Sequence, residues 1–374
     1  MTEKYIGLMS GTSMDGVDAV LVEIDSTQTH LVASISFPMG ESLKHSLLDV
    51  CLGQPTNLQT IGELDHRLGH LFADAVNTLI TKANVQPEDI KAIGSHGQTV
   101  FHSPDCEYAF TMQLGDANII SAKTGICTVA DFRRKDMAFG GQGAPLVPAF
   151  HQQLFSCSET SRVILNIGGI ANITVLQPNQ HVIGYDTGPG NMLMDAWISF
   201  HQQKSYDNNA EWALTGSVNH ALLEQLLAEP YLALSAPKST GRELFNLPWL
   251  QQHLAILAQE KGITLTPQDV QATLVEFTAM TIANDVRTFT CNNVPNELLI
   301  CGGGVHNPLL INRLQTALPQ WQILSTSERG VDSDNMEAMA FAWLAYRTLH
   351  QLPGNLPDVT GASNAIALGA IYPA

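Results

Sequence analysis

Two segments of the chain carry the same pattern, which is an apolar strand, a glycine turn and a second apolar strand. The first covers residues 6–20, IGLMSGTSMDGVDAV, and the second covers residues 162–176, RVILNIGGIANITVL. Apolar runs on both sides of a glycine turn predict β-hairpins. Because the two hairpins lie about one domain length apart, we expect duplicated α/β domains that face each other across a cleft. The alternative is coincidence, since glycine turns between strands are common.

The first turn shares its glycine spacing with a phosphate-binding loop. Gly11 and Gly16 are spaced as in a P-loop, but that motif continues with Lys and Ser or Thr, and here Val17 and Asp18 follow. A P-loop also opens a helix, whereas VDAVLVEID predicts a strand. A Walker A motif is therefore excluded. Backbone amides and hydroxyls of such a turn can still hold phosphate, and an ordinary hairpin turn is the alternative.

Length and composition predict a compact globular protein. The 374 residues leave room for two domains, with 45% hydrophobic and 14% charged residues. A formal net charge of −17 with 18 dispersed basic residues argues against nucleic acid or anionic membranes as partners. The start MTEKYIGLMS lacks a signal-peptide pattern and no apolar run is long enough for a membrane span, so we expect a cytoplasmic protein. The 6 cysteines lack CxxC spacing and are expected to be thiols.

Strands and helices are expected to alternate along the chain. The apolar periodicity predicts strands at residues 31–37 and 90–94, helices at 62–84, 116–124 and 268–286, and a loop over SHGQTVFHS. Residues 131–148, DFRRKDMAFGGQGAPLVP, combine charges with glycines and prolines, a composition that suits a domain junction. We therefore assign residues 1–130 and 362–374 to an N-terminal domain and 131–361 to a C-terminal domain.

A third glycine-rich segment follows a predicted strand in NELLICGGGVHNPLL. The strand ends at Gly302, Gly303 and Gly304, and a helix begins near Asn307 and Pro308. At such a place the backbone can approach a nucleotide closely, and the N–H groups of the helix can meet phosphate. A simple turn is the alternative.

Asp186 is the carboxylate best placed for chemistry. It follows an apolar strand in VIGYDTGPGNMLMDAW and precedes a stiff turn, Gly188-Pro189-Gly190, and a predicted helix. A side chain held at a strand end by a stiff turn points reproducibly into a cleft, as a general base must. The alternative is a turn or helix N-cap aspartate.

The order of eight sequence blocks resembles that of the anhydro-N-acetylmuramic acid kinase family. These blocks span nearly the whole chain: GTSMDGVD, GSHGQT, DFRRKDMAFGGQGAPLVP, NIGGIANIT, GYDTGPGN, APKSTGRELFN, LLICGGGVHNP and EAMAFAWLA. The family belongs to the superfamily of actin, hexokinase and the Hsp70 ATPase domain. The resemblance therefore implies an α/β fold of two ribonuclease H-like, actin-like ATPase domains that flank a nucleotide cleft.

The resemblance also implies a reaction. The enzyme would be an ATP-dependent kinase with Mg²⁺, acting on the amino sugar 1,6-anhydro-N-acetylmuramic acid in peptidoglycan recycling. By the match to GYDTGPGN, Asp186 would take a proton from the water that attacks the anomeric carbon, while O6 accepts the γ-phosphoryl group. Three alternatives are a kinase of the same fold for a free sugar hydroxyl, a sugar-independent nucleotide-gated ATPase, and a sugar-binding protein without ATP.

The matched blocks imply a set of binding residues. Expected ATP contacts are Gly11, Thr12, Ser13, Met14, Asp15, Gly16, Val17, Asp18, Asn166, Gly168, Gly169, Gly302, Gly303 and Gly304. Expected sugar contacts are Ser95, His96, Gln98, Arg133, Asp186 and Glu337. Glu337 could serve as a second acid that orients water or metal, and a helix-surface glutamate is the alternative. An arginine can hold the lactyl carboxylate by two parallel hydrogen bonds, and Arg134 is as good a choice as Arg133.

Three points stay open in the sequence. The metal ligands are not assigned, because the first turn lacks the DxGxT-type acid of distant superfamily members and its acids, Asp15 and Asp18, come later. Lys238 and Arg242 match a family block but receive no role beyond a loop near the cleft. A homodimer is the expectation of the family alone.

Overall fold

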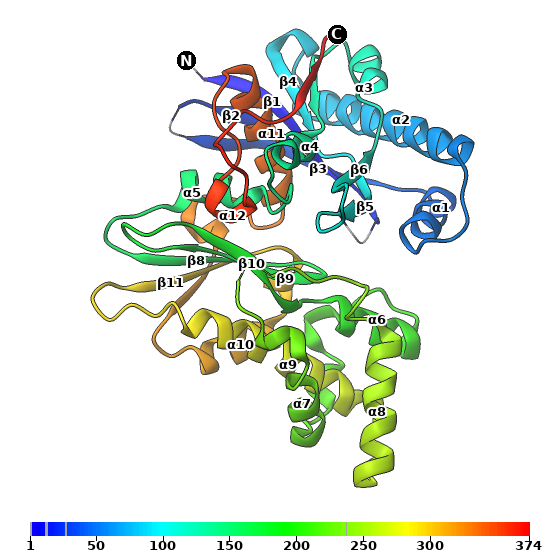
Figure 1. The fold of residues 1–374 in the computed structure, drawn as a ribbon, viewed down its shortest axis with the longest axis vertical. Helices are drawn as coiled ribbons and strands as arrows, with labels where there is room; N and C mark the ends of the chain where they lie inside the picture. Colours follow the sequence, from blue (N-terminus) through cyan, green and yellow to red (C-terminus); the bar gives the residue numbers. More distant parts are fainter. Residues whose placement is uncertain (1, 12–13, 27, 237) are drawn as a thin grey trace. The chain divides into compact units, whose positions relative to one another are not determined.

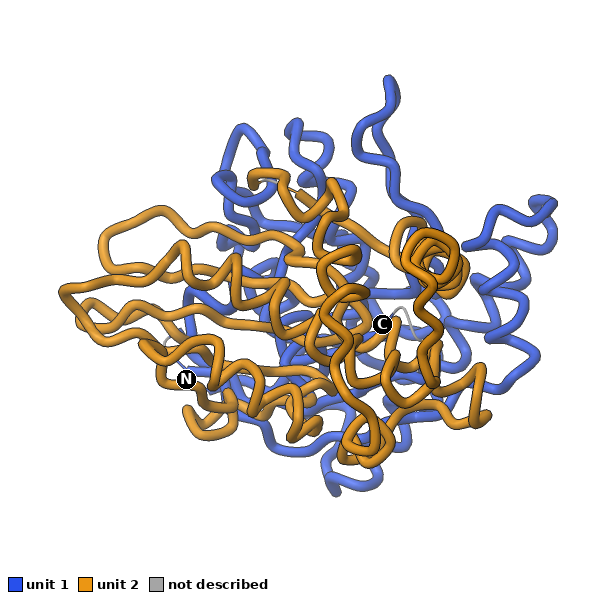
Figure 2. The backbone as a smooth tube through the Cα atoms, turned by 90° about the horizontal axis from the view of Figure 1, so that it is seen from below, with its two compact units in different colours: residues 1–154, 335–374 blue, residues 155–334 orange. Residues whose placement is uncertain are grey.

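The chain folds into two compact units in the computed structural model, which describes residues 2–11, 14–26, 28–236 and 238–374 (Figures 1 and 2). The first unit consists of Met1–Leu154 and Asn335–Ala374, and the second consists of Phe155–Asp334. The second unit is therefore continuous in sequence, whereas the first is assembled from both ends of the chain.

The first unit is built on a mixed six-stranded sheet. Its strand order is β13-β7-β4-β1-β2-β3, with β1 (Glu3–Met9), β2 (Gly16–Ile24), β3 (Thr29–Pro38), β4 (Ile90–Ser95), β7 (Thr128–Ala130) and β13 (Ala370–Tyr372). The pairs β1–β2 and β2–β3 are antiparallel, whereas β1–β4 and β4–β7 are parallel. If β1, β2, β3, β4 and β7 are numbered 1 to 5 in chain order, they lie in the order 3-2-1-4-5 across the sheet. Only the second of these five strands runs antiparallel to the others.

The second unit repeats this arrangement in a five-stranded sheet. Its order is β10-β9-β8-β11-β12, with β8 (Ser161–Ile167), β9 (Ile170–Leu176), β10 (Ile183–Pro189), β11 (Asn296–Cys301) and β12 (Gln322–Ser325). Again the two hairpin pairs are antiparallel and the two crossover pairs are parallel. The duplication and the pair of ribonuclease H-like domains are therefore confirmed.

Helices cover both faces of the first sheet. Ile6 and Leu8 pack with the apolar stripe of α2 (Leu58–Ala83), while Gly7 faces the opposite side because successive strand residues alternate. On that side lies α11 (Met336–Leu349), so close that a Cβ on Gly7 would be 1.9 Å from the Ala338 carbonyl oxygen. Gly94 meets the same helix, where an added Cβ would lie 2.0 Å from the Phe341 oxygen. Any larger residue would push α11 off the sheet.

The remaining helices and strands are divided between the two units (Figure 1). In the first unit they are α1 (Glu41–Cys51), β5 (Gln98–Ser103), β6 (Phe110–Leu114), α3 (Ala117–Thr124), α4 (Phe132–Ala138), α5 (Val147–Phe155) and α12 (Pro357–Thr360). In the second they are α6 (Met192–Gln202), α7 (His220–Leu227), α8 (Leu247–Lys261), α9 (Pro267–Arg287) and α10 (Pro308–Ala317). Among the described residues, no helix is long and apolar enough to cross a membrane.

The observed unit boundaries differ from the predicted ones. The prediction divided the chain at 130/131 and 361/362, whereas the units meet at 154/155 and 334/335. The reason is packing by α4, α5 and α11 within the first unit. Phe132 of α4 lies 5.7 Å from the Phe341 ring of α11, and Trp343 Nε1 donates to Gln153 Oε1 of α5 at 3.1 Å. The glycine and proline content of residues 131–148 therefore does not mark a junction.

Candidate functional site

The first turn, between β1 and β2, is held by a buried serine. Ser10 Oγ lies 2.7 Å from Gln98 Oε1 and 3.0 Å from the Gly16 carbonyl oxygen, which ties β5 to both ends of the turn. The N–H of Met14 donates to the Gly11 oxygen at 3.2 Å, with Met14 at φ 53°. A Cβ added at Gly11 would meet no heavy atom of the described residues within 4 Å. Gly11 therefore leaves its backbone open.

Other residues predicted for ATP in this turn have mixed surroundings. Thr12 and Ser13 lie outside the described residues. Asp15 is 71% exposed and forms an ion pair with Lys44, and Val17 is buried in the apolar core. Gly16 packs on β3, where an added Cβ would lie 2.4 Å from a backbone oxygen, and Asp18 pairs with the same strand. Val17 and Gly16 could thus contribute only backbone groups to a ligand.

His96 follows β4 and accepts hydrogen bonds from Arg133. Its Nε2 lies 3.2 Å from Arg133 Nε and 2.9 Å from Nη2. An arginine can only donate, so His96 is neutral and carries its proton on Nδ1. Burial, reinforced by the neighbouring guanidinium, holds the pKa of His96 well below its ordinary value. The ring also packs on Phe341 at 4.7 Å, which fixes its plane.

Arg133 is a fixed cation beside Glu337. Its Nη1 donates to the Gly143 oxygen at 2.9 Å, so both sides of the guanidinium are oriented by the protein. Burial lowers the pKa of Arg133 to about 10, and the carboxylates of Glu337 and Asp136 oppose that shift. Arg133 therefore stays charged at neutral pH. The structure places His96 and Glu337, which lies in the first turn of α11, close to Arg133. The predicted contact of these three residues with the sugar stays a prediction.

Asp136 organises the loop that follows Arg133 and was missed in the sequence. Its Oδ2 accepts from the Gly143 N–H at 2.8 Å, and its Oδ1 accepts from Asn355 Nδ2 at 2.7 Å and from Thr360 Oγ1 at 2.8 Å. The carboxyl group is fully buried. Gly143 is close in sequence, whereas Asn355 and Thr360 lie more than 200 residues further along the chain, so local spacing gave no signal for those two.

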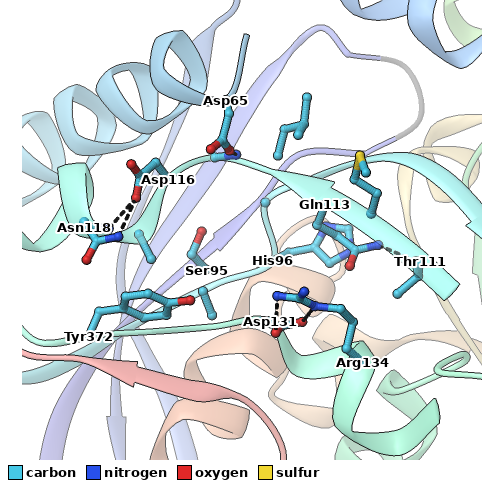
Figure 3. A pocket seen from close by; sticks show the side chains of 16 residues that line it. Asp65, Ser95, His96, Thr111, Gln113, Asp116, Asn118, Asp131, Arg134 and Tyr372 are labelled. Carbon is cyan, nitrogen blue, oxygen red and sulfur yellow. Dashed lines mark hydrogen bonds and ion pairs between the residues drawn. The ribbon is translucent and has the colours of Figure 1, made fainter. Parts of the chain in front are cut away.

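A pocket of about 400 Å³ lies at the ends of β4 and β7 in the first unit (Figure 3). Its size falls in the range of small-molecule sites. Asp116 and Asn118 lie on one side of it, and Thr111 and Gln113 on the other. Ser95 lines it with a buried Oγ that has no hydrogen-bond partner among the described residues. An unpaired buried hydroxyl favours a ligand with a polar group at this point.

Of the two neighbouring arginines, only Arg134 lines this pocket. Arg134 lines it and is paired with Asp131, Nε to Oδ1 at 2.7 Å, whereas Arg133 turns to His96. Gln98 is buried and donates to the Thr99 backbone at 3.3 Å besides its contact with Ser10. Gln98 therefore holds the first turn in place, and its predicted contact with sugar remains untested.

In the second unit, the turn after β8 is joined to the start of α6. The Gly168 oxygen accepts from the N–H of Asn191 at 2.8 Å, and the Gly169 oxygen accepts from Gly190 at 2.9 Å and from Met192 at 3.1 Å. Asn191 Nδ2 adds a bond to the Ile167 oxygen at 3.2 Å. These hydrogen bonds attach the predicted hairpin turn firmly to the first residues of α6.

The triple glycine after β11 packs against the same turn. At Gly302, which has φ 79°, an added Cβ would lie 2.4 Å from Asn166 Oδ1. At Gly304 it would lie 2.3 Å from Ile167 Cγ2. Gly303 is exposed, and its first contact among the described residues is Asn191 Nδ2 at 3.9 Å. Gly302 and Gly304 thus serve packing, and Gly303 leaves backbone open to a ligand.

Asp186 lies within β10 and not at its end. The pairing of β10 with β9 continues to Pro189 opposite Ile170, with an irregular register between Asp186 and Gly188. The prediction of a strand end is therefore wrong, since strand pairing includes the Gly-Pro turn residues. A register shift of this kind, as in a β-bulge, can change the direction of the neighbouring side chain, so the strand itself and not its end orients the Asp186 carboxylate.

The Asp186 carboxyl is held by segments distant in sequence. Thr240 N–H donates to its Oδ2 at 3.1 Å, and Tyr231 OH donates to its backbone oxygen at 2.7 Å. Burial raises the pKa of Asp186 to about 6; the Thr240 bond and Lys238 lower it, while Glu243 raises it. Three of these groups, Lys238, Thr240 and Glu243, lie in the block APKSTGRELFN, which was their sequence signal, whereas Tyr231 lies outside that block.

Among the described residues, no group of three or more His, Cys, Asp or Glu side chains is arranged to hold a metal ion. A Mg²⁺ ion bound through nucleotide phosphates takes one or two protein carboxylates and several waters. Asp15 ends the first turn and Asp18 lies in β2, and both are carboxylates of the kind that this mode uses.

Comparison with known proteins gives a consistent match over the whole chain. The family model described as anhydro-N-acetylmuramic acid kinase matches residues 3–374. The chain is 69% identical to the protein of that name from Photobacterium profundum, covering 100% of this chain and 99% of the relative. It is 61% identical to the one from Vibrio parahaemolyticus, covering 99% and 98%. A solved structure, the activator of the 2-hydroxyisocaproyl-CoA dehydratase from Clostridium difficile with bound ADPNP, is 13% identical with a TM-score of 0.46, covering 92% and 94%.

Proposed function

The chain belongs to the anhydro-N-acetylmuramic acid kinase family, and on that premise we propose that it hydrolytically opens the 1,6-anhydro ring and phosphorylates O6. It is a kinase that phosphorylates a sugar. The products of the proposed reaction are ADP and N-acetylmuramic acid 6-phosphate. The observation that carries the proposal is Asp186, a carboxylate held at its side chain and backbone whose pKa is raised to about 6 by burial.

The proposed base step follows from that environment. Asp186 takes a proton from water, the water oxygen bonds to the anomeric carbon, the bond from that carbon to O6 breaks, and O6 bonds to the γ-phosphorus as ADP leaves. A pKa near 6 leaves the carboxylate mostly ionised at neutral pH and more basic than an exposed aspartate. Mg²⁺ would supply charge neutralisation at the phosphates, and the chain would supply positioning.

Each unit offers groups for a part of the reactants. In the first unit, Arg133 is oriented by neutral His96 and suits the lactyl carboxylate, while Ser95 offers an unpaired hydroxyl. For ATP, we propose the open glycines Gly11, Gly168 and Gly303, where an added Cβ would meet little or nothing of the described residues within 4 Å. Bare backbone at these points supports close approach by phosphate.

The cellular setting is proposed from the substrate. An anhydro sugar of this kind is a breakdown product of the cell wall, so we propose peptidoglycan recycling in the cytoplasm as the process. The strongly acidic composition, with a net charge of −17, supports a protein without nucleic-acid partners. A homodimer is proposed from the family alone.

The test is release of ADP by purified protein with ATP and Mg²⁺, with and without 1,6-anhydro-N-acetylmuramic acid. Asp186→Asn is expected to lower turnover at least about 1,000-fold while both ligands still bind, because the base is lost. Asp74→Asn, at an exposed position on α2, is the matched control and should turn over normally. Mass spectrometry of the product should show addition of one water and one phosphoryl group (HPO3) to the anhydro sugar.

Two outcomes would contradict the proposal. ADP release that is indifferent to sugar would indicate an ATPase. Faster turnover of free N-acetylmuramic acid than of the anhydro sugar would indicate a kinase for a free hydroxyl, with Asp186 acting on that hydroxyl.

A further inference from the structure

We propose that Lys238 is the positioning residue of Asp186: its buried ammonium anchors residues 238–240 to helix α9 and so fixes the direction and charge environment of the carboxylate. This inference rests on the proposed role of Asp186 as the base. It assigns a function to a lysine that the sequence left without one, and all its contacts lie within the second unit.

Residues 238–240 hold Asp186 from two directions. The Asp186 N–H donates to the Lys238 carbonyl oxygen at 3.2 Å, and the Thr240 N–H donates to Asp186 Oδ2 at 3.1 Å. One bond fixes the backbone of the residue and the other fixes its carboxylate. Displacement of this short segment would therefore move the carboxylate, and small displacements of a catalytic group carry large costs in rate.

The Lys238 side chain is what attaches that segment to the rest of the unit. Its side chain is 2% exposed, and Nζ lies 3.5 Å from Asp285 Oδ2 on α9 and 3.4 Å from the Leu232 oxygen. Nζ also lies 5.4 Å and 5.3 Å from the ring centroids of Tyr185 and Tyr231. Lysine is almost never this buried without a partner, and here a carboxylate and two aromatic faces provide one.

The walls of this lysine site are themselves connected to Asp186. Tyr185 precedes Asp186 on β10 and hydrogen-bonds Asp285, while Tyr231 donates to the Asp186 backbone oxygen. The ammonium therefore sits where strand β10, helix α9 and the segments around residues 231 and 238 converge. A purely space-filling role would not require a charge at this point, and an apolar side chain of equal length would pack as well.

Charged groups around Asp186 act in opposite directions. Lys238 favours the carboxylate and Glu243 disfavours it, while Asp285, Tyr185 and Tyr231 surround the ammonium or the Asp186 backbone. If Lys238 positions Asp186 and sets its charge environment, its removal must raise the pH at which the base becomes active. Removal of Glu243 must lower it. Opposite shifts from two nearby substitutions are hard to obtain from general loss of structure.

The experiment measures kcat/KM for the anhydro sugar between pH 4.5 and 8.5. The Lys238→Met variant should move the acid limb upward by at least about half a pH unit, and Glu243→Gln should move it downward. Lys261→Met, an exposed lysine at the end of α8, is the matched control and should leave the limb in place. Since Lys238→Met leaves Asp285 buried without its cation, Lys238→Met/Asp285→Asn is included as the variant that removes both charges.

The outcomes separate this inference from the proposed function. If Lys238→Met and the double variant fold and keep the wild-type acid limb, Lys238 is only a structural residue and the inference fails, while Asp186→Asn still tests the base. If Asp186→Asn retains full turnover, the proposed base is wrong and the positioning role falls with it. If the acid limb of kcat/KM moves to higher pH in Lys238→Met and in the double variant, and Asp186→Asn is inactive, both the positioning role of Lys238 and the base role of Asp186 are supported.

Discussion

At the scale of single residues, the features that suit Asp186 to chemistry oppose folding. Its carboxylate is buried close to Glu243, so the folded protein binds a proton there more tightly than the unfolded chain does. A folded-state pKa of about 6 against 3.8 means that stability falls as pH rises through this window. Above it, the full cost of ionising the buried group is present.

We therefore expect Asp186→Asn to stabilise the protein at neutral pH. Replacing the ionised group by a neutral amide removes a cost on the order of 2 to 3 kcal/mol. The free energy of unfolding in urea, compared with wild type at pH 7.5 and at pH 3.5, checks this. The difference should nearly vanish at the lower pH, where wild-type Asp186 is protonated in the folded state and mostly protonated in the unfolded state. An equal gain at both pH values would show that ionisation is not the cause.

The two adjacent arginines are expected to differ. Arg133→Gln should raise the KM for the anhydro sugar by about 30-fold or more, because a buried, oriented cation is lost. Arg134→Gln removes an exposed side chain paired with Asp131 and should change KM less than about threefold. Steady-state kinetics of the pair decide between them, and a larger effect at Arg134 would assign the carboxylate to that residue and to its pocket.

Sequence blocks predicted single residues better than their partners. Arg133 and Glu337 were each predicted as sugar contacts, not as partners, and the structure places them close enough to interact. Their contact with the sugar stays a prediction. Tyr231 and Asp285 were not predicted, because they reach the Asp186 region from segments distant in sequence. Such contacts depend on tertiary packing, which periodicity and spacing do not encode.

At the scale of elements, the three glycines that follow β11 have different structural roles. Gly302 and Gly304 allow β11 to approach the turn after β8, while Gly303 faces outward. The strand–glycine–helix pattern predicted the segment correctly, including Asn307, whose side chain accepts from Leu310 N–H at the start of α10. Which glycine packs and which is open could be learned only from the partner strand.

Substitution by alanine should distinguish the glycine that packs, Gly304, from the glycine that is open to a ligand, Gly303. Gly304→Ala forces a methyl group into Ile167 and should destabilise the protein by about 1 to 3 kcal/mol. Gly303→Ala should leave the melting temperature unchanged and weaken binding of a fluorescent ATP analogue, since it covers open backbone. Thermal unfolding and equilibrium titration measure the two effects. Unchanged nucleotide binding in a stable Gly303→Ala protein would contradict the proposed role of Gly303.

Long periodic elements were predicted and short ones were not. The helix at 62–84 and both hairpins are confirmed because their apolar patterns extend over many residues. The segment SHGQTVFHS was expected to be a loop, yet from Gln98 it forms strand β5 paired with β6. Helices α4 and α5 were not predicted, because the glycines and prolines between them indicated a domain junction. A short element depends on its partner, which is invisible in a local window.

At the scale of the whole molecule, the net charge of −17 acts on the proposed substrate MgATP, which is also an anion. The overall field repels MgATP, so the association rate constant should rise as salt screens it, between about 10 and 150 mM ionic strength. Stopped-flow mixing with a fluorescent ATP analogue measures this rate. Sucrose at equal osmolality is the control. A rate that falls with salt would instead indicate a strongly positive local field at the binding residues.

The discontinuous first unit sets an order for events on the ribosome. Residues 155–334 contain every strand and helix of their own sheet and can fold as soon as they emerge. The first sheet is made earlier, but the face that carries Gly7 and Gly94 stays uncovered until α11 is translated. The half of the protein that is encoded first must therefore be completed last, and the nascent N-terminal sheet is the part of the chain most dependent on protection during synthesis.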